Sequence, residues 1–146
     1  MDQSIQDFIG CKRLSVVGVS RGGKKFGNTA YKELKTCGYQ VYIVHPDAKE
    51  IDGEICYPDL KSLQGKVDGV LVSVPPKQGM EVLRQAAAIG VGNVWIQQQG
   101  QSPELIALGR ELNLKLVHGK CILLYTQPVR SYHAWHRAFV KVFGKL

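Results

Sequence analysis

Short continuous runs of apolar residues alternate along the chain with segments whose apolar residues recur at helical spacing. Residues 13–19 form an almost continuous apolar run, typical of a strand that is buried on both faces of a sheet. A helix is predicted next, with Asn28 as its N-cap and Gly38 at the C′ position that favours glycine. Its apolar stripe consists of Ala30, Tyr31, Leu34 and Cys37.

The same change of period repeats towards the end of the chain. Helices are predicted at 76–89, behind two prolines, and from Ser102 to about Leu112. An irregular stretch follows the second predicted strand. Strands after the first are predicted from apolar runs at 41–44, 68–74, 94–97 and 114–117. A C-terminal amphipathic helix is predicted over about 131–143, with an apolar side made of Tyr132, Trp135, Phe139, Val142 and Phe143.

Strands and helices that alternate in this way form βα units, and the apolar strands indicate a parallel sheet that is covered on both faces. The predicted class is α/β: a Rossmann-like, doubly wound, mainly parallel sheet in a three-layer α/β/α arrangement, as a single domain over 1–146. Ligands of such sheets bind at the carboxyl ends of the strands. The segments expected along that rim are 18–28, 45–46, 73–75, 97–100 and 118–121.

Composition narrows the class of protein further. An apolar content of 45% is ordinary for a globular domain, and no apolar run reaches the roughly 18 residues of a membrane span. The N-terminal MDQSIQDFIGCKRL has two early acids and no apolar core segment, so we expect no secretory signal and a cytoplasmic protein. The four cysteines are scattered without a C-x-x-C pair, which is not the pattern of a disulfide framework.

The formal net charge of +7 favours a polyanionic partner, with a purely solubilising charge as the alternative. Nucleic acid is disfavoured, because the chain has no helix-turn-helix pair, no RNP-like aromatic strand and no basic run longer than two residues. The C-terminal helix is expected to pack on its own domain. A homodimer contact and adsorption to an anionic surface are the alternatives for it.

The strongest local signal is the loop after the first strand, VVGVSRGGKKFGN (16–28). Its glycines permit a tight turn and a close approach of backbone N–H groups to a ligand, and a helix start attracts phosphate. Arg21, Lys24 and Lys25 add positive charge. The spacing is not G-x-G-x-x-G, so a plain surface loop is the alternative. Its place after the first strand of a doubly wound sheet favours phosphate binding.

The end of the second predicted strand bears on the kind of nucleotide. An NAD site places an acid there, for the ribose hydroxyls. The sequence reads Val44-His45-Pro46-Asp47, and we expect the proline to turn Asp47 away, which disfavours NAD. The lysines suit a ligand with an extra phosphate on its ribose, and both NADP and coenzyme A (CoA) have one.

Five blocks follow one another along nearly the whole chain: VVGVSRGGKKFGN (16–28), YIVHPDAKEIDGEICYPDLKSL (42–63), VDGVLVSVPP (67–76), VGNVWIQQQG (91–100) and LKLVHGKC (114–121). Together they resemble the stand-alone CoA-binding Rossmann-like proteins, which are related to the nucleotide-binding domain of the succinyl-CoA synthetase alpha subunit. The resemblance implies CoA or an acyl-CoA as the ligand, bound by its nucleotide end.

The resemblance also implies site residues. In the first loop, residues that pass under the nucleotide, meet its phosphates or open the helix would be Gly18, Val19, Ser20, Arg21, Lys24, Lys25, Phe26, Gly27 and Asn28. Residues near the adenosine would be His45, Pro46, Ser73, Val74 and Pro75. Residues near the pantetheine arm, in 97–100 and 118–121, would include Gln97, Gly119 and Cys121.

The chain also departs from the pattern. Many relatives carry an Asp-Arg pair where this sequence has Gly119-Lys120, so no role of that pair is expected here. The synthetase reaction needs a second domain with a phosphorylated histidine, for which 146 residues leave no room. We therefore expect a non-catalytic binding or regulatory module, not an enzyme.

Three alternatives stay open. In the first, Cys121, near Lys120 and His118, is the thiolate of an acyl-transfer enzyme, or it forms a mixed disulfide with the CoA thiol. The second is an NADP-linked oxidoreductase. A regulator that senses the cofactor and binds nucleic acid or a protein is the third. The pattern H-x2-C-x11-H-x2-H, ending at His133 and His136, has zinc-like spacing, but nothing brings its two pairs together, so no metal is expected.

Overall fold

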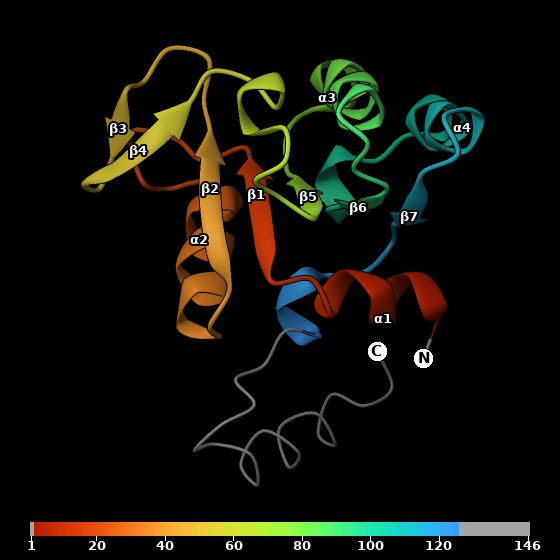
Figure 1. The fold of residues 1–146 in the computed structure, drawn as a ribbon, viewed down its shortest axis with the longest axis horizontal. Coiled ribbons are helices and arrows are strands. Elements are labelled where there is room, and N and C mark those ends of the chain that lie inside the picture. The colour runs from red at the N-terminus through yellow and green to blue at the C-terminus, as the bar shows by residue number, and fades with distance from the viewer. Residues whose placement is uncertain (1, 126–146) are drawn as a thin grey trace, which may run out of the picture.

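The computed structural model describes residues 2–125 and shows a doubly wound sheet within them (Figure 1). The strand order is β3-β4-β2-β1-β5-β6-β7, and every pairing is parallel except that of β3 with β4. The chain reverses its direction of travel across the sheet between β1 and β5, which is the switch point of a Rossmann-like fold. The strands are β1 (Arg13–Val17), β2 (Gln40–Val44), β3 (Glu50–Ile51), β4 (Glu54–Tyr57), β5 (Gly69–Val72), β6 (Asn93–Ile96) and β7 (Lys115–Val117).

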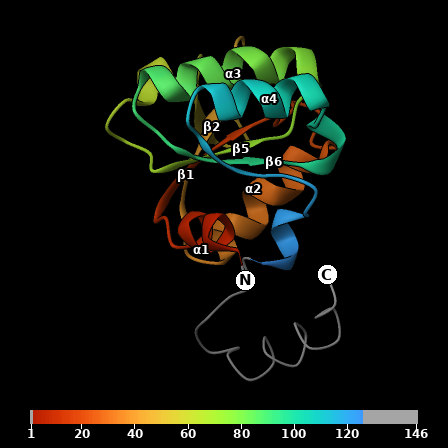
Figure 2. The ribbon, with the colours of Figure 1, turned by 90° about the vertical axis from the view of Figure 1, so that its right-hand side faces the viewer.

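Helices cover both faces of the sheet and complete three layers (Figure 2). One face carries α1 (Gln3–Ile9), α2 (Phe26–Thr36) and a 3₁₀ turn at Ile122–Leu124. The other carries α3 (Pro76–Ala88) and α4 (Pro103–Glu111). The predicted fold class is confirmed. In the described part of the chain, no helix is long and apolar enough to cross a membrane.

The core has two parts because alternate strand residues point to opposite faces of the sheet. Leu14 and Val16 of β1 pack on the α1–α2 side, whereas Val17 packs on the α3–α4 side. Trp95 of β6 is fully buried, and its ring centroid lies 5.4 Å from that of Phe8 in a tilted edge contact. That aromatic pair fixes α1 against β6, next to the edge strand β7.

The helix at the start of the chain and a hairpin after β2 were not predicted. The N-cap of helix α1 is Asp2, whose side chain accepts a hydrogen bond from the Ser4 N–H. The expected irregular stretch contains the hairpin β3–β4, turned by Asp52 (φ 51°) and Gly53 (φ 79°). Asp-Gly at a two-residue turn is a strong hairpin signal, so this feature was readable from the sequence. Strand β4 then pairs with β2 and widens the sheet.

Helix ends agree well with the sequence prediction. The Ser102 side chain accepts a hydrogen bond from the Leu105 N–H at the start of α4. Gly38 has a φ of 100° after α2, as the predicted C′ position requires. The first strand ends two residues early, at Val17, because Gly18 leaves the extended conformation with a φ of 126°. The predicted helix at 131–143 lies outside the described residues.

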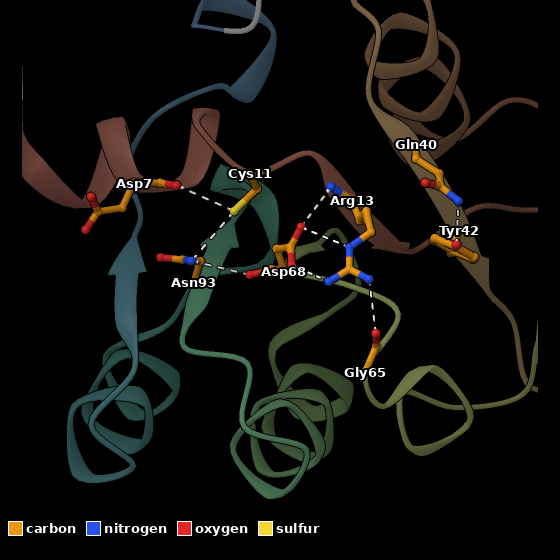
Figure 3. A network of polar contacts seen from close by, with 8 residues as sticks. All are labelled: Asp7, Cys11, Arg13, Gln40, Tyr42, Gly65, Asp68 and Asn93. Carbon is orange, nitrogen blue, oxygen red and sulfur yellow. Dashed lines mark hydrogen bonds and ion pairs between the residues drawn. The ribbon is translucent and has the colours of Figure 1, made fainter.

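An ion pair joins β1 to the start of β5 at the amino end of the sheet. Arg13 Nη2 lies 2.7 Å from Asp68 Oδ1, and Arg13 Nη1 donates to the Gly65 carbonyl oxygen at 3.0 Å (Figure 3). Asn93 Nδ2, on β6, donates to the Asp68 carbonyl oxygen at 3.3 Å. These contacts hold the first residues of three neighbouring strands together.

Replacing Asp68 by asparagine is expected to remove part of the acid sensitivity of folding. Hydrogen bonds from Arg13 hold the pKa of Asp68 below its ordinary value. Its carboxylate therefore stabilises the fold fully above about pH 4 and loses that effect as the pH falls through the lowered pKa. The side chains of Arg13 and Asp68 are 40% and 35% exposed, which limits the effect to about 1 kcal/mol. Urea unfolding should show D68N destabilised at pH 7 and closer to wild type at pH 3. An equal deficit at both pH values would contradict this account.

Candidate functional site

The loop after β1 is pressed against the end of β5 and the first turn of α2. A Cβ atom on Gly18 would lie 2.2 Å from the Ser73 carbonyl oxygen. A Cβ atom on Gly27 would lie 2.3 Å from the Gly18 carbonyl oxygen. Real Cβ atoms do not approach backbone this closely, so two of the loop glycines are required by packing of backbone on backbone.

Asn28 has a different role from the predicted one. The N-cap of α2 is Lys25, and Asn28 lies inside the first turn with only 2% of its surface exposed. Its Oδ1 accepts hydrogen bonds from Ser20 N at 3.0 Å and Ser20 Oγ at 3.1 Å, and its Nδ2 donates to Ser20 O at 2.8 Å. The prediction of an Asn28 cap is therefore wrong. Because a carboxamide has both an acceptor and a donor, this side chain can close the loop on itself.

The tip of the loop is cationic. Arg21, Lys24 and Lys25 are exposed, and none of them forms an ion pair with another residue of the described chain. Gly23 N donates to Ser20 O at 3.2 Å, which makes a turn before the lysines. No side chain caps the start of α2. The positive end of that helix and the loop cations therefore act on the same region.

A pocket of about 550 Å³ opens at the carboxyl ends of β1 and β2, next to this loop. The first loop, the segment after β2, the segment after β4 and one side of α3 form its walls. The residues that line it are Val17, Gly18, Val19, Lys25, Val44, His45, Pro46, Asp47, Pro58, Asp59, Val74, Gln78, Glu81, Val82 and Gln85.

His45 fixes the turn that follows β2. Its Nδ1 accepts hydrogen bonds from Asp47 N at 3.1 Å and from Ala48 N at 3.0 Å. Since Nδ1 is an acceptor, the neutral ring carries its proton on Nε2, which is then a hydrogen-bond donor. The same turn brings Asp47 into the pocket wall. The expectation that Pro46 turns Asp47 away from the site is therefore wrong.

The structure distributes the predicted site residues over three places. The pocket wall contains Gly18, Val19, Lys25, His45, Pro46 and Val74. The backbone frame under the loop contains Ser20, Gly27, Asn28 and Ser73, and Phe26 packs against the α1–α2 core. Other residues do not line this pocket: Arg21 and Lys24 at the loop tip, Pro75 at the start of α3, and Gln97, Gly119 and Cys121 on the rim beyond it.

Sequence reasoning missed the acidic and amide wall of the pocket. Gln78, Glu81 and Gln85 of α3 recur at the i, i+3, i+7 spacing of one helix face, which was a usable signal. Gln85 Oε1 accepts a hydrogen bond from Leu60 N at 3.0 Å and ties α3 to the segment after β4. In that segment, hydrogen bonds from Ser62 lower the pKa of Asp59, so its carboxyl group is ionised at neutral pH.

Glutamine side chains hold the rim beyond the pocket. Gln97 is 2% exposed, and its Oε1 accepts from Ile122 N at 3.3 Å. Gln98 Nε2 donates to Gly119 O at 3.1 Å, and Gln101 Oε1 accepts from Gly119 N at 2.7 Å. These bonds order the loop that contains the predicted Gly119 and Cys121. Gln97 Oε1, which was predicted to lie near the ligand, therefore binds a backbone N–H of the protein itself.

No disulfide joins the four cysteines in the described part of the chain. Burial raises the pKa of Cys11 and of Cys37 to about 11, which keeps both protonated at neutral pH. Among residues 2–125, no group of three or more His, Cys, Asp or Glu side chains is placed to hold a metal ion. His133 and His136 of the zinc-like pattern lie outside the described residues.

A parallel sheet of this order, with a glycine-rich loop and a pocket at its switch point, defines a Rossmann-like nucleotide-binding domain. This chain belongs to the CoA binding domain family, whose pattern matches residues 12–127. The resemblance inferred from the five sequence blocks is confirmed.

Relatives of known name are longer proteins. The alpha subunit of the ADP-forming acetate–CoA ligase II of Pyrococcus furiosus is 26% identical over 79% of this chain, and ADP-forming acetate–CoA ligase I of Archaeoglobus fulgidus is 30% identical over 76%. The matched stretch makes up 28% and 18% of those two ligases. The chain therefore corresponds to one part of each.

Solved structures of similar size also match. A conserved hypothetical protein of Pyrococcus furiosus superposes with a TM-score of 0.73 at 31% identity, over 77% of this chain and 97% of its own. A hypothetical protein of Pyrococcus horikoshii gives a TM-score of 0.77 at 31% identity, over 84% and 87%. This fold therefore also occurs in chains of about this length.

Proposed function

We propose that this protein binds CoA or an acyl-CoA through the nucleotide end, as a non-catalytic binding or regulatory module. The observation that carries the proposal is the pocket at the switch point, with Lys25 in its wall and the uncapped start of α2 beside it. Membership of the CoA binding domain family and the likeness to the CoA ligases support the choice of ligand.

The charges of the pocket suggest an orientation for the nucleotide. Asp47, Asp59 and Glu81 are among the lining residues, and a phosphate beside them would meet like charges. Phosphate groups therefore belong beside Lys25 and the loop tip. The adenosine belongs beside the carboxylates and the α3 amides of the lining, which can accept and donate hydrogen bonds. The thiol of CoA would carry the acyl group as a thioester, and the residues of this pocket would only bind the nucleotide end.

A binding role is favoured over catalysis because of what lines the pocket. The described lining includes no serine, threonine or cysteine that would serve as a nucleophile. Cys121 lies on another part of the rim. An acyl-transfer enzyme or an oxidoreductase would each also need a binding surface for a second substrate beside the nucleotide.

Calorimetric titration of ligand-stripped protein with CoA, acetyl-CoA, NADP and NAD tests the proposal. We expect micromolar binding of CoA and its thioester and little binding of the nicotinamide nucleotides. The presence of Asp47 in the pocket makes NAD the most informative competitor, because an acid at this place binds free ribose hydroxyls. Preference for NAD or NADP would overturn the proposal and favour an oxidoreductase.

Replacing Cys121 by serine is expected to leave the affinity for CoA within about twofold of wild type. Cys121 does not line the pocket, so the nucleotide end should bind without it. Titration under reducing conditions measures this directly, with Cys37→Ser as a matched control at a half-buried thiol on the far side of the fold. A large loss in C121S alone would contradict binding by the nucleotide end.

A further inference from the structure

A second groove lies on the rim, between α4 and the segment that follows β7. Its volume is about 410 Å³. We call it the α4 groove. It is lined by Gln101, Ser102, Pro103, Ile106, Arg110 and His118. None of these lining residues belongs to the nucleotide pocket, and the sequence analysis gave most of them no role.

The α4 groove and the nucleotide pocket are neighbours. Val74 lines the pocket, and Gln101 lines the groove. Gly100, which precedes Gln101, packs directly on Val74, because a Cβ atom on Gly100 would lie 2.5 Å from the Val74 carbonyl oxygen. The two cavities therefore lie on either side of one close backbone contact. A ligand whose nucleotide fills the pocket has the groove within reach of its other end.

The charge of the α4 groove is cationic. Neither Arg110 nor His118 forms a side-chain hydrogen bond or an ion pair with another residue of the described chain, and no described lining residue is acidic. Ser102 Oγ accepts a hydrogen bond from Leu105 N, and Gln101 Oε1 accepts one from Gly119 N, so these two oxygens already bind groups of the protein. The groove thus offers an unpaired guanidinium and an imidazole.

The shape of the lining adds a second requirement. Pro103 and Ile106, with Arg110, recur along one face of α4, so apolar side chains precede the guanidinium along the groove. A short aliphatic chain fits the apolar part. A carboxylate at its end fits the planar guanidinium, which can bind both oxygens at once.

We propose that the α4 groove binds the acyl end of a CoA thioester whose acyl chain terminates in a carboxylate. The inference rests on the proposed function, because the nucleotide pocket directs the thioester towards the groove. It narrows the ligand class from any acyl-CoA to dicarboxylic acyl-CoA. Arg110 is the residue that sets this specificity, and His118 is the additional hydrogen-bond donor.

Matched pairs of thioesters test the inference by calorimetric titration. Malonyl-, succinyl- and glutaryl-CoA are each compared with the unsubstituted acyl-CoA of the same carbon number: propionyl-, butyryl- and pentanoyl-CoA. We expect one carboxylated thioester to bind about tenfold more tightly than its partner. Arg110→Gln should abolish that preference and leave the affinity for CoA itself unchanged. His118→Gln should reduce the preference.

Arg84→Gln is the control for the loss of charge. Arg84 is exposed on α3 and lines neither cavity, so this variant should keep the preference. Since Arg110 is also exposed, its replacement leaves the core intact, and urea unfolding of both variants verifies this. Free glutarate is titrated in parallel to separate a thioester site from a site for any small carboxylate.

The possible failures are distinguishable. Tight CoA binding with equal affinities in all three pairs would overturn the α4 groove inference and leave the proposed function intact. A loss of affinity for CoA itself in R110Q would mean that the groove holds the cofactor, which overturns the acyl assignment. Glutarate binding as dependent on Arg110 as that of glutaryl-CoA would indicate an independent anion site. Absence of any CoA binding would overturn both proposals.

Discussion

Replacing Lys24 and Lys25 together by alanine is expected to weaken CoA binding about a hundredfold and to leave adenosine binding within about twofold. Lys25 lines the nucleotide pocket, and Lys24 is its exposed neighbour on the loop. Neither has a carboxylate partner in the described chain, so both charges are available to phosphate groups. Adenosine has no phosphate and should not sense their removal. Parallel titrations with CoA and adenosine measure the two affinities.

A matched variant separates local contacts from overall charge. Lys12→Ala with Lys32→Ala also removes two positive charges, at exposed positions that do not line the pocket. It should lower CoA affinity only slightly, and less at higher salt. Equal losses in the two double variants would mean that only net charge attracts the ligand. Equal losses for CoA and adenosine in the loop variant would overturn the phosphate assignment.

The alternation of strands and helices along the chain was predictable from the sequence, because it depends on apolar periodicity and on helix-end residues. Ser102 and Gly38 marked helix ends correctly for this reason. The parallel, doubly wound class of the sheet followed from that alternation. The hairpin β3–β4 was missed although Asp52-Gly53 signalled it, since two- and four-residue strands leave little periodicity to detect. Strand β4 takes its place in the sheet by pairing with β2, which is a tertiary contact.

The candidate site was only partly predictable, and the errors have a common cause. Asn28 fits an N-cap by residue type, yet its donor and acceptor are both used on Ser20. Asp47 follows a proline, yet hydrogen bonds from its own N–H and the next one to His45 Nδ1 bring the turn back to the pocket. In both places, a side chain that closes a turn decides where its neighbours point. Residue type alone does not specify which backbone groups that side chain will bind.

Replacing Gly27 by alanine is expected to destabilise the fold by about 2 kcal/mol and to abolish most CoA binding. Alanine is the better helix former by about 0.5–1 kcal/mol, so propensity alone predicts stabilisation. The clash is larger, because a Cβ atom would lie 2.3 Å from the Gly18 carbonyl oxygen, a rigid backbone atom, and overpacking costs about 1–3 kcal/mol or more. Urea unfolding gives the stability, and titration gives the affinity.

Gly22→Ala is the matched control in the same loop. No atom lies within 4 Å of a Cβ at Gly22, and its φ is not in the left-handed region, so alanine should be neutral or slightly stabilising. The pair separates two explanations for a glycine-rich loop. If both variants keep stability and affinity, the loop glycines serve only flexibility. If G27A alone fails, the contact between α2 and Gly18 positions the loop, since any relief of the clash moves Gly18 and the pocket wall that it forms.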